Sequence, residues 1–335
     1  MVKKENCYIF KLRSHRKGLM CILLCICMLL ISGCGTETVI SDAYEAYSGN
    51  VYQTGSVTDT LTTFTDSLCV TADVNYGTDQ TTSSVAEGAG VFNVTEGEVT
   101  YSQNLFEQLY PASTTKILTA YIILKNGCLT DTVTVSENAA DQDSDSSICG
   151  INAGDVITVE DLLYGLMLAS GNDAAIALAE YYSGSVDAFA DEMNAVAQSL
   201  GATNSHFVNP NGLPDEDHYT TVYDMYLIFA EAISLDSFVT IISSTSYDAT
   251  YTDADGETVE KTWSNTNKYL TGEEDAPEGI TVIGGKTGTT NAAGYCLVLY
   301  SVNSDGDDII SIVFKADGRS DLYLLMGQML EEFGG

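Results

Sequence analysis

The sequence predicts an α+β domain in which an antiparallel sheet is covered by helices. Strand-like segments lie near both ends of the folded region, and a long run of segments with helical periodicity lies between them. Strands that are segregated from helices along the chain, instead of alternating with them, favour this class over a parallel α/β fold. The 335 residues suit one large domain or two small ones, and no internal repeat is visible.

The first 34 residues have the pattern of a secretory signal that ends at a lipidation site. Six of the 13 basic residues precede position 18, and an apolar run of 13 residues, 19–31, follows them. That run is shorter than the ~20 residues that span a bilayer as a helix. Ile31-Ser32-Gly33-Cys34 resembles a bacterial lipobox. We therefore expect residues 1–33 to be removed and Cys34 to hold the chain by a lipid on the outer face of the cell membrane; an uncleaved anchor is the alternative.

The composition excludes some classes of function. After that cleavage the chain would carry seven basic against 46 acidic residues, a net charge of −39. So acidic a surface repels polyanions, and we expect no nucleic-acid partner. The spacing of the remaining cysteines fits no metal site, so we expect no metal and no other cofactor. These cysteines could form disulfides, because export permits them, or remain small buried thiols: Cys69, Cys128, Cys149 and Cys296.

The exported part begins with a tether and a first set of strands. Residues 34–66 are polar and without apolar periodicity, which places the folded domain at residues 67–335. Strand-like patterns follow at residues 68–74, 90–94 and 98–101, and a Glu-Gly turn makes the last two a hairpin. The apolar run 117–124 then predicts a buried helix, which Pro111 can introduce and Gly127 can end.

Helices dominate the middle of the domain, and strands return in its last third. Thr158 and Ser185 are expected N-caps, and the helical segments are 159–167, 174–182, 186–200 and 221–233. A hairpin is expected around the turn at residues 253–256, with strands 246–251 and 258–263. Three further strands and a closing amphipathic helix follow, at residues 279–286, 293–302, 308–315 and 320–333.

Ser113 and Lys116 stand together at the start of the helix around residues 117–124. Three residues apart, they share one helix face. A buried, unpaired ammonium is costly, so a lysine at this place needs a reason. Desolvation lowers the pKa of a lysine, and a neutral lysine can take the proton of a neighbouring serine, which becomes a nucleophile. The simpler alternative is a helix start with a lysine at the surface.

Two later motifs favour the catalytic interpretation. Ser170-Gly171-Asn172 forms a polar turn between two apolar helices. Lys286-Thr287-Gly288 lies on a predicted edge strand, where glycines allow another backbone to approach closely. In this order, Ser-x-x-Lys, Ser-Gly-Asn and Lys-Thr-Gly match the active-site motifs of penicillin-binding proteins and serine β-lactamases.

The residues around these motifs indicate one family within this class of enzymes. Segments 110–116, 168–174, 206–213 and 285–295 resemble those of the low-molecular-weight D-alanyl-D-alanine carboxypeptidases, serine peptidase family S11. The resemblance covers about residues 68–335. It implies a β-lactamase/DD-peptidase-like fold, with a five-stranded antiparallel sheet and a helical subdomain that carries the first two motifs. Many members also have a second β-domain and a C-terminal anchor, and we expect neither here.

The resemblance also implies a reaction. A peptidoglycan pentapeptide would lose its terminal D-alanine through an acyl-enzyme on Ser113, and β-lactam antibiotics would acylate the same serine. Lys116 would be the general base, Ser170 would relay a proton to the leaving amine, and Asn172 would orient Lys116 and hold the substrate amide. The backbone N–H groups of Ser113 and Thr289 would form the oxyanion hole.

The substrate's free carboxylate would need cations and hydrogen-bond donors. Lys286, Thr287, Gly288 and Thr289 on the edge strand supply some of these, and Arg319 falls near the place where the family has a carboxylate-binding arginine. The alternative for Arg319 is a solvated helix start. His206 is interpreted as structural, because Lys116 already supplies a base.

Two other functions remain open at this stage. A class A β-lactamase would need a glutamate on a loop after the second motif, and no convincing Glu-x-x-x-Asn loop occurs between Asn172 and Lys286. A non-catalytic lipoprotein that only binds peptidoglycan would not need every motif residue, yet all are present. Transpeptidase or endopeptidase side activity is not decided by the motifs. We expect a monomer.

Overall fold

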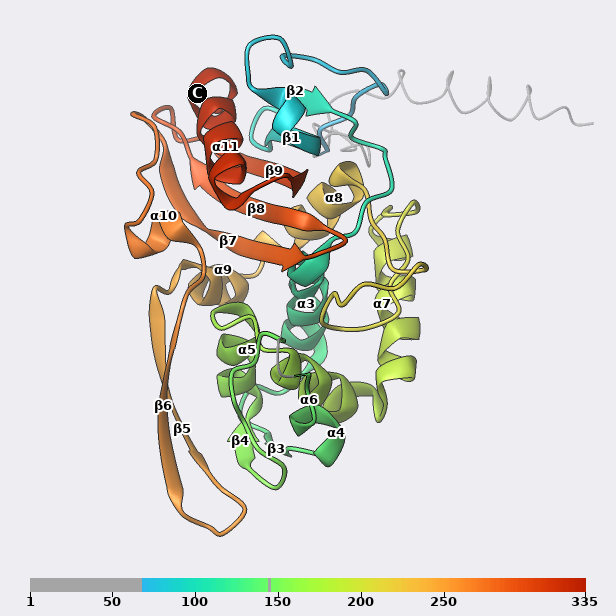
Figure 1. The fold of residues 1–335 in the computed structure, drawn as a ribbon, viewed down its shortest axis with the longest axis vertical. Coiled ribbons are helices and arrows are strands. Elements are labelled where there is room, and N and C mark those ends of the chain that lie inside the picture. The colour runs from blue at the N-terminus through green and yellow to red at the C-terminus, as the bar shows by residue number, and fades with distance from the viewer. Residues whose placement is uncertain (1–67, 144–145) are drawn as a thin grey trace, which may run out of the picture. The chain divides into compact units, whose positions relative to one another are not determined.

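The computed structural model describes residues 68–143 and 146–335 (Figure 1). The predicted signal, Cys34 and the tether lie outside the described residues. Within them, a five-stranded antiparallel sheet has the order β2-β1-β9-β8-β7, which confirms the predicted sheet and the α+β class. Its strands are β1 (Ala86–Asn93), β2 (Glu98–Gln103), β7 (Thr281–Thr290), β8 (Gly294–Val302) and β9 (Asp308–Ala316).

The sheet is covered on both faces, and the side chains alternate between them. Helix α11 (Arg319–Phe333) packs on one face, against Leu297 and Leu299 of β8. Cys296 and Val298 point the other way, into the larger core that includes α3 (Lys116–Asn126) and α8 (Val222–Ile233). Successive residues of a strand point to opposite faces, so one strand serves both cores. Figure 1 shows the two layers of helices on either side of the sheet.

The helices of the middle region begin where the capping residues predict. The predicted N-caps Thr158 and Ser185 each accept a hydrogen bond from a backbone N–H of the first turn of the following helix. Thr221, which was expected inside a helix, caps α8 in the same way. Besides α3 and α8, the longer helices of this region are α5 (Val159–Met167), α6 (Asn172–Ser183), α7 (Val186–Ser199) and α9 (Asp236–Ser243). The domain also has three short helices, η1 (Ser83–Val85), α4 (Glu137–Ala140) and α10 (Lys268–Thr271). Among the described helices, none alone is long and apolar enough to cross a membrane; α8 and α9 together meet those criteria as a pair bent by 105°.

A second sheet accompanies these helices, so the subdomain that was expected to be helical also contains strands. Its four strands are β3 (Thr132–Thr134), β4 (Val156–Thr158), β5 (Ser246–Thr252) and β6 (Thr258–Ser264). The hairpin β5–β6 confirms the predicted one. Strands β3 and β4 have three residues each, too few to show alternation in the sequence. Trp263 of β6 is buried and donates from its indole Nε1 to the Cys149 carbonyl oxygen.

The strand predicted at residues 68–74 is wrong. The segment forms no regular strand, because its backbone groups bond to side chains and not to a neighbouring strand. The Cys69 N–H donates to the Tyr226 hydroxyl at 2.9 Å, and the Tyr223 hydroxyl donates to the Cys69 carbonyl at 3.0 Å. Cys69 is buried and Leu68 packs against the same core, whereas Val70 and Val74 are exposed, so the segment does not have the one buried face of a strand.

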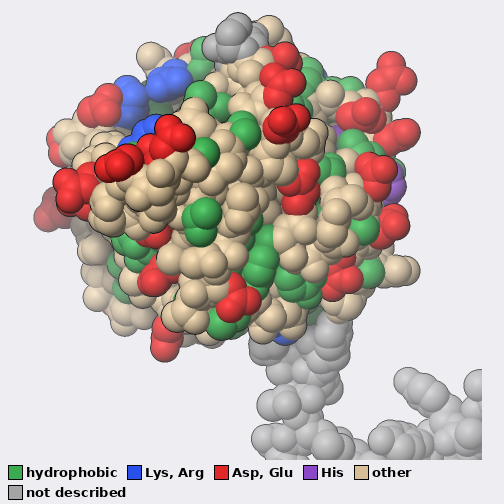
Figure 2. Space-filling view, turned by 90° about the horizontal axis from the view of Figure 1, so that it is seen from below, with side chains coloured by type: hydrophobic (Ala, Val, Ile, Leu, Met, Phe, Trp, Pro, Cys, Tyr) green, Lys and Arg blue, Asp and Glu red, His purple; other side chains and the backbone are tan. Residues whose placement is uncertain are grey.

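The cysteines and the surface charges can now be placed. In the described chain Cys69, Cys149 and Cys296 are buried free thiols and Cys128 is an exposed one, so the disulfide alternative is not observed. The face shown in Figure 2 carries many carboxylates and few Lys or Arg side chains. The few cations that are fully buried, Lys116 and Lys286, are therefore the unusual ones.

Candidate active site

Ser113 lies on a short 3-10 turn, η2 (Ala112–Thr115), which leads directly into α3. The turn is strained, since Ala112 has a φ of 48°, a left-handed conformation that is uncommon for a residue with a side chain. A neighbouring loop packs tightly on this turn: a Cβ on Gly212 would lie 1.8 Å from the Ala112 carbonyl oxygen. Only glycine fits there, and the contact fixes the turn that presents the half-buried Ser113.

Lys116 is fully buried and has three polar partners. Its Nζ lies 3.0 Å from Ser113 Oγ, 2.8 Å from Asn172 Oδ1 and 2.8 Å from the carbonyl oxygen of Asn211. A neutral amine has two N–H donors and one lone pair. It can therefore donate to the two carbonyl oxygens while it accepts the hydroxyl proton of Ser113. The predicted pairing of Ser113 and Lys116 on one face is confirmed.

The electrostatic surroundings favour the neutral form of Lys116. Burial lowers its pKa well below the ordinary lysine value, the Lys286 ammonium lowers it further, and Asp173 acts in the opposite sense with a smaller effect. Burial also lowers the pKa of Lys286 to about 7. The pKa of each lysine is thus lowered, mainly by burial, and the neutral form avoids the cost of burying a charge.

The turn at Ser170 connects the two lysines. Ser170 has a φ of 58° and is buried, and its Oγ accepts from Lys286 Nζ at 2.9 Å. The next residues open helix α6, so Asn172 reaches Lys116 from the first turn of that helix. Of the four non-glycine residues with positive φ in the described part of the chain, two, Ala112 and Ser170, border the same few reactive groups. Backbone strain of this kind persists only where the surroundings fix it.

Asp173 fixes the loop of residues 147–151 beside the Ser170 turn. Its carboxylate accepts hydrogen bonds from backbone N–H groups at the start of α6 and on the opposite loop, those of Cys149, Gly150, Ile151 and Ala174. The Asn172 N–H also donates to the Ser147 carbonyl oxygen at 2.8 Å. These bonds hold the loop that carries Ser147 against the second motif. Neither Asp173 nor Ser147 was identified from the sequence, because their partners are more than 20 residues away.

Strand β7 forms the opposite side of the site. A Cβ on Gly288 would lie 3.0 Å from both the Pro111 carbonyl oxygen and the Ser113 nitrogen. The edge strand therefore runs against the turn that carries Ser113, and the predicted close approach is confirmed. Lys286 is directed inward to Ser170, whereas Thr287 and Thr289 line the cleft.

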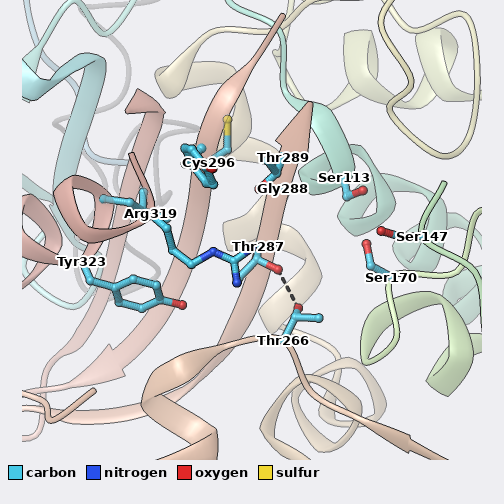
Figure 3. Close-up of a pocket in the computed structure, with 12 residues that line it drawn as sticks. Ser113, Ser147, Ser170, Thr266, Thr287, Gly288, Thr289, Cys296, Arg319 and Tyr323 are labelled. Atoms are coloured by element: carbon cyan, nitrogen blue, oxygen red, sulfur yellow. Dashed lines mark hydrogen bonds between the residues drawn. The ribbon is translucent and has the colours of Figure 1, made fainter. Parts of the chain in front are cut away.

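A small pocket of about 140 Å³ opens beside Ser113 along this strand (Figure 3). Arg319 is the first residue of α11, and its guanidinium extends toward Thr287 from the side of β7 opposite to Ser113 and Ser170. The guanidinium carbon lies 5.9 Å from the centre of the Tyr295 ring, a cation–π arrangement. Ion pairs within the described residues do not involve Arg319. The arginine thus lines the pocket, as the carboxylate-binding interpretation requires.

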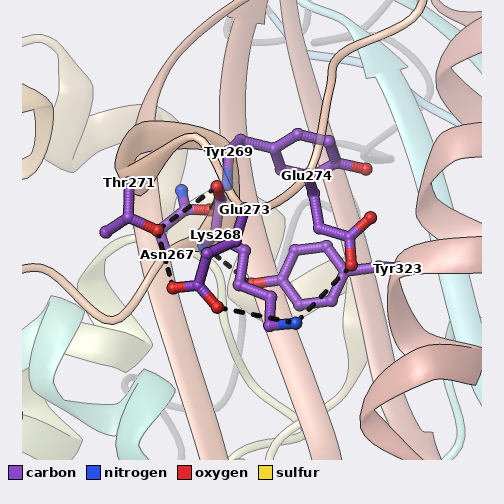
Figure 4. A network of polar contacts seen from close by, with 7 residues as sticks. All are labelled: Asn267, Lys268, Tyr269, Thr271, Glu273, Glu274 and Tyr323. Carbon is purple, nitrogen blue, oxygen red and sulfur yellow. Dashed lines mark hydrogen bonds and ion pairs between the residues drawn. The ribbon is translucent and has the colours of Figure 1, made fainter.

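Thr266 and Tyr323 complete this pocket, and sequence reasoning missed both. Thr266 Oγ1 lies 2.6 Å from Thr287 Oγ1. The segment around Thr266 is fixed by a polar network (Figure 4), in which the backbone N–H of Lys268 donates to the Tyr323 hydroxyl and Lys268 Nζ pairs with two glutamates. The neighbours of Thr266 have structural contacts: Asn265 donates to a backbone carbonyl, and Asn267 caps α10.

The histidines stand outside the reactive group of residues. His206 is half-buried and its ring contacts the Asp217 carbonyl oxygen, which agrees with a structural role. His218 is buried; its Nδ1 accepts from the Val208 N–H at 3.1 Å, so its Nε2 carries the proton and donates to Thr115 Oγ1 at 2.9 Å. Burial lowers the pKa of His218 to about 4. A neutral His218 therefore ties the turn of Ser113 to the loop that contains Asn211.

The arrangement can perform acyl transfer. It provides a serine next to a buried amine, a second amine bonded to Ser170, two residues before the Asn172 that contacts the first amine, and an arginine at the end of a small pocket. Among residues 68–143 and 146–335, no group of three His, Cys, Asp or Glu side chains is placed to hold a metal ion. A serine activated by lysine beneath an edge strand is the arrangement of the enzymes that penicillins acylate.

Comparisons with known proteins define the family. The sequence profile of the D-alanyl-D-alanine carboxypeptidase family, peptidase S11, matches residues 76–318. The D-alanyl-D-alanine carboxypeptidase DacF of Bacillus subtilis (strain 168) is 34% identical over 253 residues, 73% of this chain. The solved Streptomyces K15 DD-transpeptidase is similar with a TM-score of 0.66 and 32% identity, over 73% of this chain and 96% of that one. This chain belongs to the D-alanyl-D-alanine carboxypeptidase family.

The relatives differ in length and in the activity that their names state. The matched region spans 61% of the length of the Bacillus protein. A D-alanyl-D-alanine carboxypeptidase of Streptomyces sp. (strain K15) is 34% identical, over 69% of this chain and 81% of its own length. Structures from that strain are titled DD-transpeptidase. The family therefore includes proteins named for hydrolysis and for transfer to another amine.

Proposed function

We propose that this chain is a serine carboxypeptidase that removes the terminal D-alanine from peptidoglycan stem peptides ending in D-Ala-D-Ala. The observation that carries the proposal is the contact between Ser113 Oγ and the buried Nζ of Lys116 at 3.0 Å. Family membership supports the choice of substrate, and the pocket that ends at Arg319 has room and charge for a small residue with a free carboxylate.

In the first half of the proposed reaction, Lys116 takes the Ser113 proton while Ser113 Oγ bonds to the carbonyl carbon of the penultimate D-alanine. Backbone N–H groups of Ser113 and Thr289 would stabilise the oxyanion; one such donor is typically worth about 10²–10³ in rate. The C–N bond then breaks, and the leaving amine takes a proton from Lys116 by way of Ser170. Asn172 keeps Lys116 in place and binds the substrate amide.

In the second half, a water molecule attacks the acyl-enzyme carbonyl and gives its proton to Lys116. The bond between that carbon and Ser113 Oγ then breaks, Lys116 returns the proton to Ser113 Oγ, and the shortened peptide leaves with a new carboxylate. Arg319 and Thr287 bind the carboxylate of the departing D-alanine, Lys286 keeps Lys116 neutral, and Gly288 lets the strand lie close to Ser113. In the described part of the chain, no glutamate lines the cleft on either side of Ser113. This supports slow deacylation after a β-lactam reacts, and so a penicillin target instead of a β-lactamase.

The experiment measures D-alanine release from a peptide that ends in D-Ala-D-Ala, together with labelling by a fluorescent penicillin. We expect release and stable labelling with the native chain and neither with Ser113→Ala. Labelling without release would contradict the carboxypeptidase assignment. In that case the second candidate is a transpeptidase, which the name of the Streptomyces K15 structures favours, and an added amine acceptor would then yield a new peptide. Rapid penicillin turnover would instead identify a β-lactamase.

We also propose that the chain is exported, cleaved before Cys34 and held by a lipid on the outer face of the cell membrane as a monomer. The basic start, the apolar run 19–31 and the lipobox-like residues before Cys34 support this. Cys34→Ala should prevent incorporation of a labelled fatty acid and release the protein from the membrane fraction. Fatty-acid labelling that persists in this variant would contradict the lipid site. Sedimentation of the detergent-solubilised chain tests the monomer.

A further inference from the structure

Arg319 is unusual in so acidic a chain, because no carboxylate neutralises it. It is the only arginine after residue 16, and Asp317 and Asp321 lie two positions before and after it. Even so, none of the ion pairs within the described residues involves its guanidinium. The Asp321 carboxylate turns back to the start of α11, where a Cβ on Gly318 would lie 2.7 Å from its Oδ2. The N–H donors of Arg319 therefore remain available to a ligand.

The side chain of Arg319 needs a contact that directs it into the pocket. The residue is exposed at the first position of α11, and a long exposed side chain has many rotamers. Its guanidinium carbon lies 5.9 Å from the centre of the Tyr295 ring. An aromatic ring attracts a guanidinium through its face and accepts none of the in-plane N–H hydrogen bonds. Tyr295 can thus hold the arginine and leave its planar fork to a carboxylate.

Tyr295 is itself fixed by the sheet. It belongs to β8 and pairs with Thr289 of β7 on one side and with Ala316 of β9 on the other. Its half-buried side chain packs against the core between the sheet and α11. The ring therefore ties Arg319 to the strand register that also places Thr289 beside Ser113 in the pocket.

We propose that Tyr295 is a positioning residue for substrate binding, whose ring face holds Arg319 in the orientation that receives the terminal carboxylate of the peptide. This inference rests on the proposed carboxypeptidase function and adds a residue to its substrate site. Tyr323 also lines the pocket, four residues after Arg319 on the same helix face. Its ring, however, faces Lys268 Nζ at 5.5 Å, and its hydroxyl accepts from the Lys268 N–H, so it serves the neighbouring polar network.

The test compares a peptide that ends in D-Ala-D-Ala with the same peptide amidated at its C-terminus, which lacks the carboxylate. The native full-length chain should cleave the acid with a kcat/KM about tenfold higher or more, as expected for hydrogen bonds to a charged group. Tyr295→Leu should lower this ratio about two- to fivefold, the range for an exposed cation–π contact, by slowing only the acid. Tyr295→Phe keeps the ring face and should keep the ratio. Tyr300→Leu, which removes another half-buried tyrosine of β8 outside the pocket, is the matched control and should also keep it.

Two further variants separate positioning from packing. Trifluorophenylalanine incorporated at position 295 keeps the shape of the ring but withdraws the negative charge from its face. It should lower the ratio as Tyr295→Leu does, which also covers the case in which the leucine variant fails to fold. In an Arg319→Leu background, Tyr295→Leu should change the ratio no further, because the interaction that it removes is already lost.

Several results would overturn the inference. These are a native ratio near one, equal slowing of both peptides in Tyr295→Leu, a loss in Tyr295→Phe as large as that in Tyr295→Leu, and a ratio that trifluorophenylalanine leaves unchanged. A further fall of the ratio in the Arg319→Leu background would overturn it as well. If the native chain releases no D-alanine from the acid peptide, the proposed function itself fails, which is a distinct result.

Discussion

The two sides of the cleft hold their functional side chains by different means. On the helical side, Ser113, Lys116 and Ser170 depend on strained turns and on buried polar contacts with distant segments. On the sheet side, β7 from Lys286 to Thr289 pairs residue by residue with β8, from Val298 to Tyr295. A strand ladder positions side chains through backbone bonds, which do not depend on residue type. The helical side is therefore expected to be the more sensitive to substitution.

The largest effect is expected for Lys116→Arg. An arginine stays protonated at any working pH, so it cannot take the Ser113 proton. The rate of acylation by a fluorescent penicillin should fall by about 10³-fold, within the usual range for loss of a general base. Lys125→Arg, an exposed position on the same helix α3, is the control and should react like the native chain. Acylation within tenfold of native would refute the role of Lys116 as base.

A stability comparison of Asp173→Ala with Thr287→Val tests the two sides directly. Asp173→Ala leaves four backbone N–H groups without their acceptor, whereas Thr287→Val removes one contact at the cleft, that with Thr266. We expect the free energy of unfolding to fall by about 3–4 kcal/mol for the first and by no more than about 1 kcal/mol for the second. Denaturant titration measures both. An equal loss of unfolding free energy in the two variants would contradict the view that the helical side is more sensitive to substitution than the sheet side.

His218 makes the helical side sensitive to acid. The pKa of His218 is about 4 in the folded chain and 6.5 for an unburied histidine, as in the unfolded chain. Between these two pH values the unfolded chain therefore binds more protons than the folded chain. The free energy of unfolding should fall as the pH is lowered from 6.5 to 4, by up to about 3 kcal/mol. The measurement is the difference in stability between the native chain and His218→Gln across this range. A difference that does not change between pH 6.5 and 4 would contradict this assignment to His218.

The sheet side has one expected weak point, Gly288. An added methyl group would touch the Pro111 carbonyl and the Ser113 nitrogen at 3.0 Å, so strand and turn must separate slightly. Gly288→Ala should cost about 2 kcal/mol of stability and slow acylation about tenfold. Gly327→Ala on α11, where a Cβ would meet nothing closer than 4.0 Å, should be neutral or slightly stabilising. An unimpaired Gly288→Ala enzyme would mean that the close approach is not needed.

The same contrast explains what could be predicted from the sequence. Alternation and turn signals located β5, β6, β8 and β9, and hydroxyl caps located the starts of α5 and α7, because these are local properties. The segment 68–74 was wrongly predicted as a strand, because it is held by hydrogen bonds to Tyr223 and Tyr226, which are over 150 residues away in the sequence. The short strands β3 and β4 and helix α9 gave no clear periodic signal.

The candidate site shows the same division. Motif chemistry identified Ser113, Lys116 and Lys286, which the structure brings together. The carbonyl of Asn211, the hydroxyl of Thr266 and the carboxylate of Asp173 were missed, because a backbone oxygen or a common polar residue has no distinctive pattern. Their importance arises from packing between remote segments, and this information is present only in the folded chain.

The central claim is that Lys116 is neutral at neutral pH, and its titration tests this most directly. Lysine labelled with ¹³C at Cε gives an NMR signal whose shift follows the charge of each side chain, and the Lys116 signal is assigned by its loss in Lys116→Arg. We predict a pKa for Lys116 well below the ordinary lysine value, with burial as the main cause. A Lys116 signal that titrates near the ordinary value of about 10.4 would contradict the claim.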